Sequence, residues 1–143
     1  MNKELTFQIT NIDLLEATLN PQYGSLEENQ VFNYDINLEH KINIDEQALI
    51  VVCRVTITSE NQEEIFGKYK AGCIFKIENL KDFTNEEDEN KLDLPNTLVV
   101  SLNSISISTT RGMMASFYRG TYLHNAILPI INPTSFNKEN AKN

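Results

Sequence analysis

Alternation of apolar and polar residues is the feature that most constrains how this chain can fold. It is nearly unbroken over residues 32–44, where one face carries Phe32, Tyr34, Ile36, Leu38, His40, Ile42 and Ile44. The same period recurs over residues 49–57 and 65–77, and the polar sequence SENQEE joins these two runs. Because successive side chains of a strand point to opposite sides, this period predicts half-buried strands, and the short polar join predicts an antiparallel hairpin.

The first strand, over residues 5–20, carries an irregularity. Leu5, Phe7 and Ile9 alternate with polar residues, but after Asn11 the apolar residues change face. A shift of one residue in a strand moves its side chains to the other side of the sheet. The pattern therefore predicts a β-bulge or a bend in the first strand.

The spacing of apolar residues changes after residue 92. Residues 79–92 are strongly charged and polar and predict a mobile connector. Asp93 as N-cap, Pro95 in the first turn and Gly112 as a stop signal favour a helix starting near Pro95. The apolar or β-branched residues recur every three or four positions: Leu94, Leu98, Leu102, Ile105 and Thr109. Residues 104–108 also alternate, so a strand remains the alternative for this segment.

Composition and charge restrict the possible functions. The 143 residues are 41% apolar, enough for one domain over residues 1–143 with a flexible tail at 134–143. The net charge of −8, from 20 acidic and 12 basic residues, disfavours a nucleic-acid partner, whose phosphates need cations. We find neither an apolar leader nor a membrane-spanning run, and we expect a cytoplasmic protein without membrane insertion.

The residues that carry most enzyme and metal chemistry are scarce. Cys53 and Cys73 lie in phase with apolar strand neighbours, which predicts buried, reduced thiols. With His40 and His124 as the only histidines, we expect no metal, no cofactor and no enzyme activity. His40 fits a hydrogen-bonded residue in an apolar row. The pairs Arg111-Gly112 and Arg119-Gly120 fit either turns or an anion site, and turns are the preferred interpretation.

Six segments, taken in order, resemble the SecB family of bacterial export chaperones: LTFQI, VFNYDINLEHKINID, VVCRVTIT, YKAGCIFKI, LPNTLVVSLNSISISTTRG and ILPIINPTSF. The resemblance spans nearly the whole chain. It implies an α+β fold, with a four-stranded antiparallel sheet, one long helix packed on one face and a short irregular C-terminal segment. It also implies a holdase chaperone that binds unfolded polypeptides without ATP.

The resemblance also implies a client-binding groove on the second strand. The matching residues are Phe32, Ile36, Leu38, Ile42 and Ile44. An apolar surface of this kind binds many chains by burying their side chains, and open strand edges accept backbone hydrogen bonds. The alternative is that the same row belongs to the core.

Docking to the motor ATPase SecA, which uses acidic residues in the family, is only partly matched. Glu16 matches the first acid, but Asn20 and Lys68 stand where two others are expected. This departure favours a divergent member. The alternatives are an export chaperone, a solitary chaperone that controls a toxin-antitoxin pair, and an interaction scaffold that lost the groove.

Self-association into a homo-dimer or homo-tetramer is expected as well. In SecB-like proteins the long helix pairs dimers into a tetramer, and one sheet cannot cover every apolar residue of such a helix. Val99, Leu102 and Ile107 are the residues expected at this oligomer interface.

Overall fold

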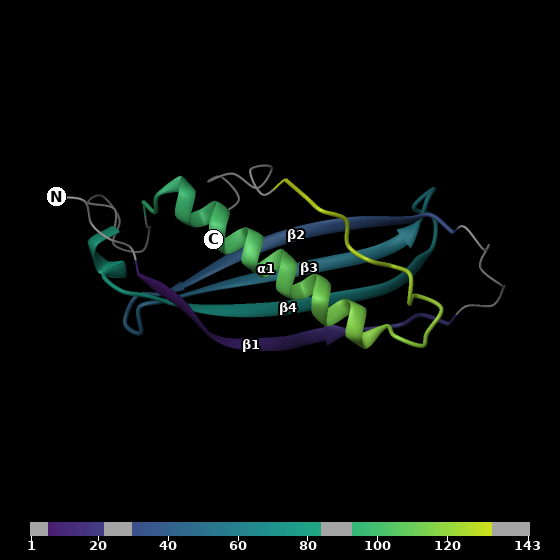
Figure 1. Cartoon of the computed structure of the whole chain (residues 1–143), viewed down its shortest axis with the longest axis horizontal. Helices are drawn as coiled ribbons and strands as arrows, with labels where there is room; N and C mark the ends of the chain where they lie inside the picture. The colour runs from purple at the N-terminus through teal and green to yellow at the C-terminus, as the bar shows by residue number, and fades with distance from the viewer. Residues whose placement is uncertain (1–5, 22–29, 84–92, 133–143) are drawn as a thin grey trace.

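The computed structural model describes residues 6–21, 30–83 and 93–132. They form a four-stranded antiparallel sheet of β1 (Phe7–Ala17), β2 (Phe32–Asn43), β3 (Ala48–Ser59) and β4 (Ile65–Ile77). The strand order is β1-β4-β3-β2, so β1 and β2 are the two edges. The long helix α1 (Asn96–Phe117) crosses one face of the sheet obliquely and packs on β3 and β4 (Figure 1). The predicted α+β fold is confirmed.

Two bulges interrupt β1, where the change of face predicted a single bulge or bend. The register of β1 against β4 shifts between Ile9 and Asn11, and again between Leu14 and Glu16. Residues paired directly across an antiparallel ladder point to the same side of the sheet. Ile9, Ile12 and Leu14 therefore share the side covered by α1, called here the helix-side face.

Helix α1 is confirmed as a helix, but the predicted boundaries need correction. Its N-cap is Pro95, not Asp93, and no side chain caps the first turn. The helix also continues through Gly112 to Phe117. A glycine costs a helix interior only about 1 kcal/mol, and here the packing of the buried Met114 and Tyr118 beyond it outweighs that preference.

The helix packs on the sheet through leucines and small polar residues. Leu98, Leu102 and Met114 are buried together with Asn103, Ser106 and Thr110. The Ser106 hydroxyl donates to the Leu102 carbonyl at 2.8 Å, and the Thr110 hydroxyl donates to the Ser106 carbonyl at 2.7 Å. These bonds within the helix let hydroxyl groups be buried without an unpaired donor.

The chain after α1 contains neither helix nor strand over residues 118–132, as predicted for the C-terminal segment. Leu123, Ala126 and Leu128 are nevertheless buried in the core. Arg111 holds this segment against the helix: its Nε donates to the Leu128 carbonyl and its Nη2 to the Pro129 carbonyl, both at 2.8 Å. Arg111 is thus a structural anchor.

Part of the predicted connector is folded. Leu80–Phe83 forms a short 3₁₀ helix, η1, and Leu80 is fully buried in the core. The prediction overlooked Leu80 because charged neighbours surround it in the sequence. Residues 84–92 of the predicted connector, and the predicted tail at 134–143, lie outside the described residues.

Candidate polypeptide-binding surface

The row predicted to bind clients lies on the helix-side face of β2. Ile36, Leu38 and Ile42 pair with Val55, Cys53 and Leu49 of β3, all of which are core residues. Leu38 is only 5% exposed, so it belongs to the core and its assignment to a groove is corrected. Phe32, Ile36 and Ile42 are half-buried and packed against the core, and Ile44 follows in the turn. The row therefore forms the margin of the core along one sheet edge.

His40, the one polar residue of this row, is held by the helix. It is 2% exposed, and its Nε2 lies 2.7 Å from Oδ1 of the fully buried Asn103 in α1. A buried imidazole needs such a partner. This geometry confirms the prediction of a hydrogen-bonded histidine and ties β2 to α1.

The two edge strands differ in regularity. β2 pairs with β3 through twelve consecutive residue pairs, from Phe32 to Asn43, without a register shift. β1 carries two shifts over a similar length. Bulges twist an edge away from a regular ladder and hinder the addition of another strand. β2 is therefore the edge better suited to receive an extended polypeptide.

β1 instead exposes aliphatic side chains on both faces. Ile9, Ile12, Leu14 and Leu15 are 42–51% exposed. The first three lie on the helix-side face, beyond the part of the sheet that α1 covers, whereas Leu15 lies over Gly72 on the opposite face. We call these four residues the β1 apolar surface. The predicted site did not include them, although the change of face after Asn11 was the signal that marked them.

The three residues predicted at the oligomer interface are part of the core. Val99, Leu102 and Ile107 are 2%, 0% and 3% exposed within the single chain. The inference that apolar helix residues beyond the reach of the sheet stay exposed was wrong, because η1 and the segment after α1 add further buried residues around the helix. The large exposed apolar residues of α1 are Ile105 and Phe117.

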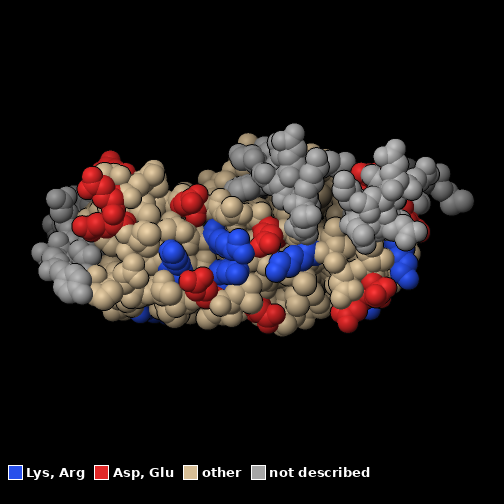
Figure 2. Space-filling view, turned by 180° about the vertical axis from the view of Figure 1, so that it is seen from behind, with Lys and Arg blue, Asp and Glu red and all other residues tan. Residues whose placement is uncertain are grey.

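The face of the sheet opposite α1 carries a row of mixed charge (Figure 2). In the strand register, Glu16 of β1 lies opposite Lys70 of β4, and Lys70 lies opposite Arg54 of β3. An Arg54 guanidinium nitrogen lies 2.9 Å from a carboxylate oxygen of Glu39. Glu16 and Glu39 thus have basic neighbours, and the surface around Glu16 is not uniformly acidic.

The family resemblance leads one to expect acids at positions 20 and 68. The residues present, Asn20 and Lys68, help join the chain after β1 to β4. The Asn20 side-chain amide donates to the Ile65 carbonyl at 2.7 Å. The Lys68 backbone N–H donates to the Thr18 hydroxyl at 2.9 Å. These contacts make Asn20 a structural residue.

The two cysteines are free and buried. Burial raises the pKa of the Cys53 thiol to about 11 and also raises that of Cys73. Both thiols are therefore protonated at neutral pH, and a protonated thiol is a poor nucleophile and metal ligand. Within residues 6–21, 30–83 and 93–132 no cluster of three or more His, Cys, Asp or Glu is placed to hold a metal.

Among the described residues, no helix has both the length and the apolar character needed to span a membrane.

Comparison with known proteins relates the chain to a chaperone fold. No family model and no curated protein sequence matches it. A solved structure does: the SecB-like chaperone Rv1957 of Mycobacterium tuberculosis, in complex with a ChAD peptide from the Rv1956 HigA1 antitoxin. The identity is 14%, the TM-score is 0.56, and the match covers 87% of this chain and 89% of that one. The chain thus has a SecB-like fold.

Proposed function

We propose that this protein is a cytoplasmic, ATP-independent holdase chaperone that binds unfolded or partly folded polypeptides along β2. The observation that carries the proposal is the regular β2 edge, whose half-buried apolar row lies beside a strand side that no other described strand pairs with. Such an edge offers backbone hydrogen bonds without regard to sequence, while the apolar row contributes side-chain burial. The fold likeness to a chaperone that holds a peptide supports this reading.

A second candidate is a solitary chaperone that controls a toxin-antitoxin pair. The peptide bound to Rv1957 comes from an antitoxin, which favours this role over protein export. The incomplete acidic surface around Glu16, with Asn20 and Lys68 in place of acids, also argues against strong SecA docking. In both roles the protein binds a partly folded polypeptide. They differ in whether the partner is a secreted precursor or an antitoxin.

The decisive experiment for the chaperone proposal is suppression of aggregation. A chemically denatured protein unrelated to this chain is diluted into buffer, and light scattering is followed with and without equimolar chaperone and without ATP. A holdase reduces the scattering at near-stoichiometric amounts. An interaction scaffold with the same fold leaves it unchanged, and that result would remove the proposal.

Replacing Ile42 and Ile44 with serine should weaken client binding. Both residues are half-buried at the β2 margin, and full burial of one aliphatic side chain contributes roughly 1.5–3 kcal/mol, so partial burial gives a smaller loss. We expect strongly reduced aggregation suppression and only a modest fall in melting temperature, because Ile42 packs against the core but is not fully buried.

The matched control is Lys41→Ser, which alters the exposed residue that precedes Ile42 in β2. It should leave both properties intact. If the double variant instead loses its folded structure, these residues act mainly as core, and the proposed location of the client on β2 fails.

The β1 apolar surface is proposed as the site of self-association into a dimer or tetramer. Four exposed aliphatic residues on one edge strand form a surface that a second copy can bury. Ile12→Ser combined with Leu14→Ser should therefore shift the protein toward monomer in multi-angle light scattering.

Gln8→Ser, an exposed change on the same strand, is the control and should leave the oligomer unchanged. A parent protein that is monomeric at micromolar concentration would rule out this assembly.

A further inference from the structure

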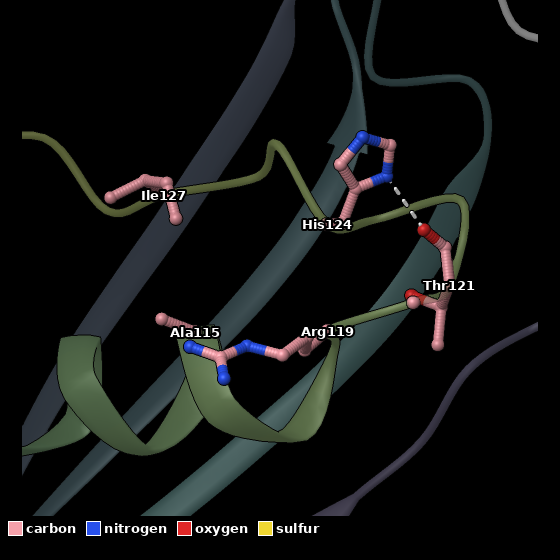
Figure 3. A pocket seen from close by; sticks show the side chains of 6 residues that line it. Ala115, Arg119, Thr121, His124 and Ile127 are labelled. Carbon is pink, nitrogen blue, oxygen red and sulfur yellow. Dashed lines mark hydrogen bonds between the residues drawn. The ribbon is translucent and has the colours of Figure 1, made fainter.

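A cavity lies at the C-terminal end of α1, between the last turns of the helix and the segment that follows (Figure 3). Its volume is about 620 Å³, and it is lined by Ala115, Arg119, Gly120, Thr121, His124 and Ile127. In Figure 3 the Arg119 side chain extends along the helix toward Ala115, beneath the segment that carries His124 and Ile127. The exposed Arg119 guanidinium therefore lies in a hollow whose lining includes two aliphatic side chains, Ala115 and Ile127.

The electrostatics of this region differ from those of the whole chain. The net charge is −8, yet residues 94–132 contain no Asp, Glu or Lys, and their charged residues are Arg111 and Arg119. Arg111 is occupied by its bonds to Leu128 and Pro129. No side-chain hydrogen bond or ion pair joins Arg119 to another described residue. Arg119 thus offers its donors to a ligand.

His124 lies at the other side of the cavity. Its Nδ1 is 2.8 Å from the Thr121 carbonyl oxygen, which can only accept, so Nδ1 carries a hydrogen. This bond fixes the ring, and in the neutral imidazole Nε2 is then an acceptor, so Arg119 is the side chain of this cavity that donates to an anion. The Thr121 hydroxyl is already used, since it donates to the Tyr118 carbonyl and accepts from the Leu123 N–H.

We propose that this cavity binds a carboxylate carried by the polypeptide client, an inference that rests on the proposed function. The planar fork of a guanidinium matches a carboxylate with two parallel hydrogen bonds. The half-exposed Ile127 and the Ala115 side chain suit the aliphatic part of the same client segment. Arg119, Gly120 and His124 are exposed, so a segment of a bound polypeptide can reach the cavity from solvent.

A carboxylate attached to an apolar segment of a client fits the combination of Arg119 with Ala115 and Ile127 better than a free anion does. A free anion is repelled by the net charge of −8 and gains little from contact with Ala115 and Ile127. A carboxylate on a polypeptide that is already bound along β2 is instead carried to the cavity by that polypeptide. Arg119 then hydrogen-bonds the carboxylate and so favours clients that carry one. The proposed clients therefore carry an acidic residue within an apolar stretch.

A double-mutant cycle tests this selection. Two labelled peptides with the same Leu- and Ile-rich sequence, one with a central Glu and one with Gln, are titrated with the parent protein and with Arg119→Gln. Fluorescence anisotropy reports the dissociation constants. We expect the parent to favour the Glu peptide by about three- to tenfold, and Arg119→Gln to bind both equally. Lys76→Gln, which removes an exposed positive charge from the sheet, is the control and should retain the preference.

The outcomes separate the inference from the proposed function. Equal binding of both peptides by the parent overturns the carboxylate site. If neither peptide binds, the holdase proposal fails, and the cavity is tested by titrating acetate while the Arg119 Nε–H signal is followed by NMR. A shift of that signal that saturates supports the carboxylate site, and no shift overturns it. Tighter binding of inorganic phosphate than of acetate also overturns it, in favour of a phosphate ligand.

Discussion

Replacing Leu102 with alanine should lower the free energy of unfolding by about 2–5 kcal/mol, because Leu102 is fully buried and the change leaves a cavity in the core. The matched control is Ile105→Ala on the same helix. Ile105 is 37% exposed, so its truncation removes fewer contacts and should cost about 1 kcal/mol or less. Urea denaturation followed by circular dichroism measures both.

The Leu102 experiment also decides between two positions for this residue. Truncation of a core residue lowers the free energy of unfolding by the same amount at every protein concentration. Truncation of a residue at an oligomer interface lowers the free energy of unfolding by an amount that depends on protein concentration, since association stabilises the folded state by mass action. If the loss of stability for Leu102→Ala disappears on dilution, the assignment of Leu102 to the core is wrong.

Gly67→Ala should destabilise the protein by at least about 2 kcal/mol. A Cβ at this position meets the Thr18 carbonyl oxygen at 2.7 Å and the Tyr118 Oη at 2.8 Å. These two atoms are hydrogen-bonded to each other at 2.9 Å, so the methyl group displaces a contact that joins α1 to the end of β1. The expected result is a lower midpoint of urea denaturation.

Gly112→Ala is the control for Gly67→Ala and should act in the opposite direction. No atom lies within 4 Å of a Cβ built at Gly112, and the residue is in the interior of α1. Alanine favours a helix over glycine by up to about 1 kcal/mol, so this variant should be slightly more stable than the parent. Destabilisation of both variants to the same degree would show that the Gly67 contacts do not matter.

The strands and their pairing could be predicted from sequence because a period of two is a local property. The alternation around Ile36 predicts β2 without knowledge of its neighbours, and the change of face after Asn11 predicts the first bulge of β1. The end of α1 could not be predicted in this way. Gly112 is a local stop signal, whereas the helix continues because Met114 and Tyr118 find partners far away in the sequence.

The candidate site could be predicted only in part, because the depth of a residue depends on what covers it. The row on β2 is where the sequence suggested, but periodicity cannot distinguish the buried Leu38 from the half-buried Ile42. It also cannot reveal that α1 packs on β3 and β4 and leaves Ile12 and Leu14 exposed. The path of α1 across the sheet decides both the burial of Leu38 and the exposure of Ile12 and Leu14.

The strand order β1-β4-β3-β2 also has a consequence for folding. β2, β3 and β4 follow one another through short turns, so their pairing closes short loops and forms early. β1 pairs with β4, the strand most distant from it in the sequence, and the loop-closure entropy of that step is larger. We therefore expect β1 to pair last, after a three-stranded intermediate in which one side of β4 is still unpaired. In that intermediate two copies can exchange their first strands, so domain swapping through β1 is the characteristic misfolding hazard of this topology.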